Sequence, residues 1–209
     1  MDVSKRLSFS LDHRDQGPNK KLAKDIVDSQ DKELLEELIQ LLESRPAAGL
    51  QKDCAVTLAY VAEQSPRMLT PYTTQMINNM DASVNRVIWG SMMVLAHIAP
   101  LVSQELYSEL PKIMDAMDKG TVVTRDYGFR ILVELYQVDE IKEDMLYIIL
   151  EQLAKSPGNQ LGQYAERFMP VVTVDHKPTF IKTLEERRGD LTNEHHLKRL
   201  TKNLKKLYK

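Results

Sequence analysis

The sequence predicts an all-α protein built as a solenoid of four to five repeated helix pairs. The first observation is that one pattern of residues recurs every 37 positions through the middle of the chain. The second is composition: leucine, methionine, alanine, glutamate and lysine fill the pattern, whereas only 8 of the 209 residues are glycine. A fixed period of this size is typical of architectures in which successive helical units stack side by side.

The repeat shows itself as columns of equivalent residues spaced 37 positions apart. The first column is apolar and contains Ile39, Met76, Ile113 and Leu150. The second holds small residues, Cys54, Ser91, Gly128 and Ala165. The third holds leucine or methionine, at Leu58, Leu95, Leu132 and Met169. Small side chains let two helix backbones approach closely where they cross. The single cysteine, Cys54, is therefore predicted to be a buried packing residue rather than a nucleophile.

Residues 1–30 are expected to form a polar N-terminal arm with a short capping helix over 20–28. In that helix Leu22, Ile26 and Val27 are expected to cover the end of the first repeat, because a stacked unit otherwise leaves one apolar face in water. The first dozen residues are expected to be mobile.

Residues 31–175 are expected to hold the repeats themselves. Asp31 is placed to cap the first helix, and Pro46 and Pro66 follow the ends of the first and second helices. The connections between helices are short, so consecutive helices should lie antiparallel and in contact. The expected helices cover residues 31–44, 48–64, 68–80, 84–99, 104–117, 122–137, 141–155 and 161–169.

Residues 176–209 are expected to form a degenerate fifth pair, with helices over 178–187 and from about 191 to the end. Asp190 or Thr192 can cap the last helix. This segment carries ten lysines and arginines against four acids, a net charge of +6. Its cations give either the solvated face of a capping helix or a site for RNA, DNA or an acidic protein. The candidate residues for such an anionic partner are Lys198, Arg199, Lys202, Lys205 and Lys206.

Residues 31–170 resemble the HEAT-repeat (armadillo-like) family. Each unit has a first helix, a turn that holds an aspartate such as Asp81 or Asp118, and a second helix with a small residue and a leucine. Pro111 resembles the proline that often bends the first helix in that family. The resemblance implies a right-handed superhelix. The family also tends to place an arginine early in the second helix, and only Arg125 does so here, so the aspartate–arginine ladder is expected to be largely missing.

No arrangement of residues indicates an enzyme, a metal site or a cofactor. The sequence has no glycine-rich phosphate loop, no cysteine pair and no His-Glu dipeptide of the kind that HEAT-like iron hydroxylases use. Glu194, His195 and His196 are adjacent, and neighbours on a helix point about 100° apart, so they cannot close on one metal. The expectation is a non-enzymatic protein.

The second helices of HEAT solenoids line a concave face, and the register of this sequence gives the residues expected there. Trp89 and Met93 are four positions apart and should share one side of their helix. Tryptophan and methionine together are typical of protein-binding surfaces, although Trp89 could equally pack against the next helix. The residues predicted to contact a protein or peptide partner are Lys52, Tyr60, Trp89, Met93, His97, Asp126, Arg130 and Glu134.

Two other functions stay open. One is nucleic-acid binding through the basic C-terminal helix. The other is a HEAT-like alkylpurine DNA glycosylase, which the low aromatic content of 6% and the single tryptophan disfavour. The lone cysteine, the acidic residues near the N-terminus and the absence of an apolar run of about 20 residues suggest a cytoplasmic protein that does not enter a membrane.

Overall fold

The computed structural model of the chain describes residues 2–208. In that range it contains 12 α-helices and no strand, so the prediction of an all-α helical repeat is confirmed. The chain divides into two compact units, one ending at Gly128 and the other starting at Phe129. The boundary falls inside a helix.

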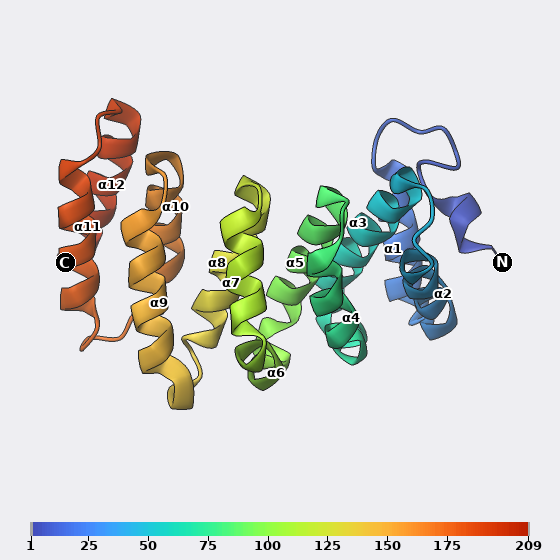
Figure 1. Cartoon of the computed structure of the whole chain (residues 1–209), viewed down its shortest axis with the longest axis horizontal. Helices are drawn as coiled ribbons and strands as arrows, with labels where there is room; N and C mark the ends of the chain where they lie inside the picture. Colours follow the sequence, from blue (N-terminus) through green and yellow to red (C-terminus); the bar gives the residue numbers. More distant parts are fainter. Residues whose placement is uncertain (1, 209) are drawn as a thin grey trace. The chain divides into compact units, whose positions relative to one another are not determined.

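The first unit is a double layer of helices (Figure 1). Helices α1, α3 and α5 pack side by side in one layer, while α2 packs on α3 and α4 packs on α5. The helices of this unit are α1 (Gly17–Ser29), α2 (Lys32–Glu43), α3 (Ala48–Gln64), α4 (Thr73–Asn78), α5 (Asn85–Ile98), α6 (Ser103–Ser108), α7 (Leu110–Lys119) and the first turns of α8 (Val122–Leu135).

The predicted ends of α2 and α3 agree with the structure, whereas two predicted first helices are broken. Asp31 caps α2 by accepting a 2.9 Å hydrogen bond from the Leu34 N–H. The stretch expected to be one helix over 68–80 is a series of 3-10 turns around α4, and the one over 104–117 is split into α6 and α7 at Glu109. Both breaks lie beside prolines, Pro71 and Pro111, which remove a backbone donor and disfavour helix in the residue before them.

The N-terminal residues are packed onto the first unit, so the expectation that they are mobile is wrong for residues 3–9. Val3 and Leu7 are buried. The Val3 N–H donates to Glu37 Oε1 at 3.0 Å, and the Phe9 N–H donates to Asp53 Oδ2 at 2.7 Å. These bonds tie the arm to both α2 and α3. The sequence pattern did not show them because the acceptors lie more than 30 positions away.

Helices α3 and α5 come into close contact at Ala55 and Gly90. A Cβ atom added to Gly90 would lie 2.6 Å from the Ala55 Cβ, so no larger residue fits without a shift. The contact lies one residue from the predicted small column, whose members Cys54 and Ser91 are also buried. Burial raises the pKa of the Cys54 thiol to about 12, and the charge of Asp53 adds to the rise. Cys54 is therefore a packing residue, as predicted.

The second unit contains the rest of α8 and four further helices. Helix α9 (Lys142–Lys155) packs against α11 (Lys177–Gly189), and α10 (Gly158–Phe168) packs against α12 (Glu194–Leu207). The Phe168 ring stands edge-on to the rings of Tyr136 and Phe180, with centroids 4.8 and 5.1 Å away. Asn193 caps α12 by accepting from the His195 and His196 N–H groups, so the predicted caps Asp190 and Thr192 are wrong.

Candidate partner-binding face

Helices α3 and α5 share a stripe of residues that are half-buried or exposed, whereas most residues beside the stripe are buried. Between Asp53 and Ala62 every residue of α3 is buried except Val56 and Tyr60, and in α5 the residues of one side are half-buried. With the two helices in contact at Ala55 and Gly90, both stripes lie on the same side of the layer. We call this surface the α3/α5 face, and its residues are Lys52, Val56, Tyr60, Arg86, Trp89, Met93 and His97.

Each aromatic ring of the α3/α5 face has a cation over it. The Lys20 Nζ lies 5.4 Å from the centroid of the Tyr60 ring, and the Arg86 guanidinium lies 4.7 Å from that of Trp89. Such pairs are electrostatically favourable because the face of an aromatic ring is negative. The spacing of Arg86 and Trp89 on one helix could have suggested the second pair. Nothing in the sequence connects Lys20 to Tyr60, which is 40 positions away on another helix.

Trp89 is partly packed and partly available. Its indole Nε1 is enclosed and has no hydrogen-bond partner among the described residues, whereas the residue as a whole is half-buried. Met93, one turn further along α5, is also half-buried. The tryptophan therefore packs into the layer in part and also contributes to its surface, and its contact with a partner stays a prediction.

The remaining cation of the face, Lys52, stands beside a buried acid. Its Nζ lies 4.0 Å from Asp53 Oδ1, and the Asp53 side chain is 2% exposed. Asp53 also accepts the Phe9 N–H, so the N-terminal arm and Lys52 use the same carboxylate. Lys20 and Arg86 form no ion pair with any residue that the structure describes.

The predicted partner-binding residues fall into both units. Lys52, Tyr60, Trp89, Met93 and His97 are brought together on the α3/α5 face, and Asp126 is half-buried on the part of α8 that belongs to the same unit. The other two predicted residues, Arg130 and Glu134, belong to the second unit. There Glu134 accepts a 2.9 Å hydrogen bond from the Gln137 side chain.

The five predicted cations of α12 differ in what they contact. Arg199 is fastened to α10, where its Nε and Nη2 donate to the two carboxylate oxygens of Glu166 at 3.0 and 2.6 Å. This contact lowers the pKa of Glu166 and raises that of Arg199. Lys198 pairs with Glu194 at 2.6 Å. The rest of the set, Lys202, Lys205 and Lys206, is exposed.

A shallow pocket of about 470 Å³ lies on the outer side of α12. Lys198, Lys202 and Lys205 line it together with Leu197 and Thr201. The three lysines are spaced by four and three positions, so they form one stripe along the helix.

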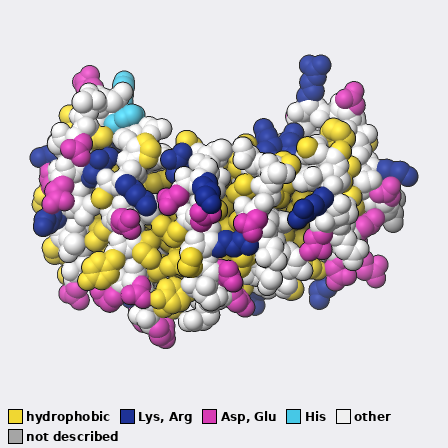
Figure 2. All heavy atoms as spheres, viewed as in Figure 1, with side chains coloured by type: hydrophobic (Ala, Val, Ile, Leu, Met, Phe, Trp, Pro, Cys, Tyr) yellow, Lys and Arg dark blue, Asp and Glu magenta, His cyan; other side chains and the backbone are white. Residues whose placement is uncertain are grey.

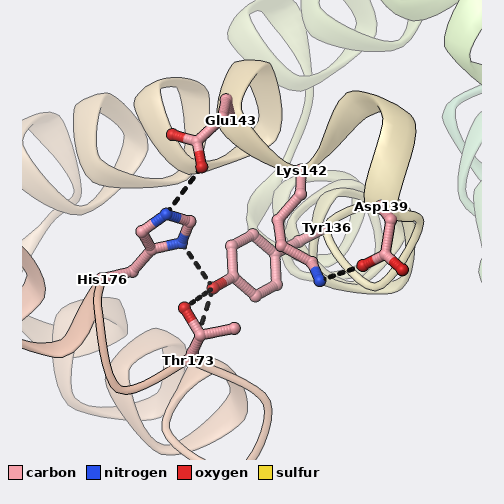
Figure 3. A network of polar contacts seen from close by, with 6 residues as sticks. All are labelled: Tyr136, Asp139, Lys142, Glu143, Thr173 and His176. Atoms are coloured by element: carbon pink, nitrogen blue, oxygen red, sulfur yellow. Dashed lines mark hydrogen bonds and ion pairs between the residues drawn. The ribbon is translucent and has the colours of Figure 1, made fainter.

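A polar network that the sequence did not reveal joins three segments of the second unit (Figure 3). The buried Tyr136 hydroxyl accepts the Thr173 N–H at 3.1 Å and lies 2.8 Å from His176 Nδ1. The other nitrogen of the His176 imidazole, Nε2, lies 2.8 Å from Glu143 Oε1. The network ties the end of α8 to the start of α9 and to the segment before α11. We therefore regard it as structural.

Within residues 2–208, no group of three or more histidines, cysteines and carboxylates is placed to hold a metal ion. In the same range no helix has both the length and the apolar character needed to cross a membrane.

Comparison with known proteins finds likeness in structure alone. No family model matches the chain, and no curated protein matches it. A designed armadillo repeat protein shares 14% of its residues, with 98% of each chain covered and a TM-score of 0.60. Another, from a set described as computationally designed armadillo repeat proteins for modular peptide recognition, shares 14% over 97% of each chain with a TM-score of 0.61. An engineered protein shares 17% over 99% of each chain, with a TM-score of 0.60. At these identities the likeness concerns the fold.

Proposed function

Starting from an armadillo/HEAT-like helical repeat fold, we propose that this protein is a non-enzymatic scaffold whose α3/α5 face binds a protein or peptide partner. The observation that carries the proposal is the pair of half-buried aromatic rings, Tyr60 and Trp89, on neighbouring helices, each with a cation over it.

The composition of this face suits partner binding. Tryptophan, tyrosine and arginine are the residues most enriched among those that dominate binding energy at protein interfaces. Met93 adds a flexible apolar side chain that can adapt to the shape of a partner. One structural neighbour comes from a set described as designed for modular peptide recognition, and this description supports the proposal of a peptide-binding surface.

A selection from a random peptide library tests the proposal. Peptides of 12 to 16 residues would be selected on the full chain, and their binding would be followed by the fluorescence of Trp89, the only tryptophan of the protein. We expect bound peptides to change its emission. We also expect Trp89→Ala, measured by the anisotropy of labelled peptide, to weaken binding at least tenfold, because truncating an aromatic anchor typically costs about 2 kcal/mol or more.

Met93→Ala should weaken binding by a smaller factor, and Tyr147→Ala provides the matched control. Tyr147 is 70% exposed on α9 of the second unit, so its loss removes an exposed aromatic ring elsewhere. Circular dichroism would verify that each variant keeps its helices. If Trp89→Ala and Met93→Ala both retain full affinity, the partner does not bind at the α3/α5 face.

Nucleic-acid binding through α12 is the second candidate, and the lysine stripe in the outer pocket is the observation that favours it. Deleting α12 would be a poor test because Leu200, Leu204 and Leu207 are buried. The double variant Lys202→Glu/Lys205→Glu changes only exposed side chains. The binding of labelled single- and double-stranded DNA to the unmodified protein and to this variant would be compared by anisotropy at low and moderate salt. Binding that weakens with salt and is lost in the variant supports this candidate. Equal affinity of the two proteins, or no binding to either, rejects it.

A further inference from the structure

The two cations that lie over the aromatic rings, Lys20 and Arg86, form no ion pair with a carboxylate of the described chain. We infer that the α3/α5 face selects an acidic peptide. Two carboxylates of that peptide, on either side of an apolar segment, would pair with Lys20 and Arg86. This inference rests on the proposed function and names the chemical class of the partner. The ion pairs of the described chain include neither Lys20 nor Arg86. Elsewhere on α1, Lys24 pairs with Asp28.

The charges around the two rings favour an anionic partner. The charged side chains of α3 and α5 are Lys52, Asp53, Glu63 and Arg86; Asp53 is buried, and Glu63 is exposed one turn beyond Tyr60. With Lys20 from α1, these two helices present three cations against one exposed acid. A charge-assisted hydrogen bond to a partner carboxylate is stronger than a neutral one, and it can form while the ring still supports the cation from below.

The other layer of the same unit has the opposite charge. On α2 the exposed side chains include Glu33, Glu36 and Glu43, against one lysine, Lys32. Figure 2 shows acidic side chains gathered over the region of α2. An acidic peptide would therefore be repelled from one layer and attracted to the other, which gives a choice of face as well as affinity.

The positions of the two cations also set the spacing of the acids. Lys20 is on α1 and Arg86 is on α5, and α3 packs between these helices. The Lys20 ammonium lies over the Tyr60 ring, so the distance to span runs from Tyr60 on α3 to Arg86 on α5. Counted from the contact at Ala55 and Gly90, Tyr60 is five residues further along α3 and Arg86 is four residues back along α5, about 14 Å along the helix axes. With the helices about 8–10 Å apart, the two cations are separated by about 16 Å. An extended chain advances about 3.3 Å per residue, so two acids about five or six positions apart would reach both cations. The residues between them would cross Tyr60, Val56 and Met93 and should be apolar.

Four labelled peptides of 12 residues test the inference. They share a core of leucine and phenylalanine and differ at two positions: glutamates five apart, glutamines five apart, lysines five apart, or two adjacent glutamates. Affinity for the full chain is measured by anisotropy at low and moderate salt. We expect the spaced glutamates to bind at least tenfold tighter than the glutamines and about fivefold tighter than the adjacent glutamates. The lysine peptide should bind weakest, and added salt should reduce the preference for glutamate.

Variants identify the cations responsible. Arg86→Ala and Lys20→Ala should each reduce the preference for glutamate over glutamine severalfold while leaving the glutamine peptide nearly unchanged. Lys32→Ala is the matched control, because Lys32 is an exposed lysine on α2 of the same unit. It should leave every affinity unchanged.

The outcomes separate this inference from the proposed function. Equal affinity for glutamate and glutamine peptides overturns the acidic preference while binding at the face still stands. Equal affinity for spaced and adjacent glutamates overturns the assignment of Lys20 and Arg86 as separate anchors. If no designed peptide binds but the library peptides lose affinity in Trp89→Ala, only the acidic preference is overturned. If the library peptides also bind Trp89→Ala with unchanged affinity, both the acidic preference and the proposed function are overturned. A 20-nucleotide single-stranded DNA that displaces the glutamate peptide and loses affinity in Trp89→Ala would assign the face to nucleic acid instead.

Discussion

The two units of this protein hold their cations in different ways. On the α3/α5 face Lys20 and Arg86 lie over aromatic rings and form no ion pair with a described residue. On α12 Arg199 donates to both oxygens of Glu166, and Lys198 pairs with Glu194. A ring supports a positive charge without neutralising it, whereas a carboxylate neutralises it. Two of the five cations predicted on α12 are therefore neutralised by carboxylates of the chain itself, whereas the two cations on the rings are not.

The first prediction concerns whether α12 is mainly a packed helix. Leu204 is 2% exposed, so Leu204→Ala should lower the free energy of unfolding by about 2–5 kcal/mol through lost burial and the cavity left behind. Urea unfolding followed by circular dichroism measures this. The control Lys202→Ala, on the exposed side of the same helix, should change stability by no more than about 0.5 kcal/mol. Similar small effects for both would mean that α12 is only loosely attached.

The second prediction concerns the contact that aligns the α3/α5 face. In Gly90→Val the new side chain would meet Ala55, so we expect a loss of about 1–3 kcal/mol in stability and a change in Trp89 emission. Gly189→Ala is the control, since a Cβ there meets no atom within 4 Å. If Gly90→Val unfolds at the same urea concentration as the unmodified protein, the close crossing of α3 and α5 is not as described.

The third prediction tests Arg199 as a structural cation. Arg199→Ala should cost up to about 1 kcal/mol at neutral pH, because the pair with Glu166 is bidentate but partly exposed. The pair lowers the pKa of Glu166, so its contribution is present above the ordinary glutamate pKa and disappears as the pH falls through the lowered value. Urea midpoints of the two proteins should thus differ at pH 7 and converge in acid. A difference that persists in strong acid would attribute the effect to lost packing of the arginine stem.

The fourth and smallest prediction concerns the cation on Trp89. Arg86→Ala should reduce stability by only about 0.5–1 kcal/mol, because both groups are partly exposed. Removal of the guanidinium should shift the Trp89 emission maximum without a change in helicity. Lys32→Ala serves again as the control, and an unchanged emission spectrum in Arg86→Ala would mean that the cation does not rest on the ring in solution.

Much of the fold could be predicted from the sequence because the repeat is written in local patterns. The bounds of α3 agree with the structure at both ends, and the acid that caps α2 was recognised from its position before an apolar stripe. The division of the chain after Gly128 could not be predicted, because it falls inside α8, where the helical pattern continues without a break.

The candidate face was predicted only in part because its chemistry depends on contacts between distant helices. The register of the second helices gave Tyr60, Trp89 and Met93, since residues four apart share one side of a helix. It could not give Lys20, which reaches Tyr60 from α1. Nor could it show that Arg199 is held by Glu166, 33 positions away, although both are charged residues in helical segments.

Cys54 has a practical consequence for studying this protein. It is the single thiol of the chain, it is fully buried, and its pKa of about 12 leaves almost none of the reactive thiolate at neutral pH. A thiol reagent can therefore modify the native protein only during moments when α3 separates from its neighbours. The rate of thiol modification would therefore measure how often the first unit opens locally, with no introduced label or substitution. A partner that holds α3 against α5 should slow this reaction as its occupancy rises.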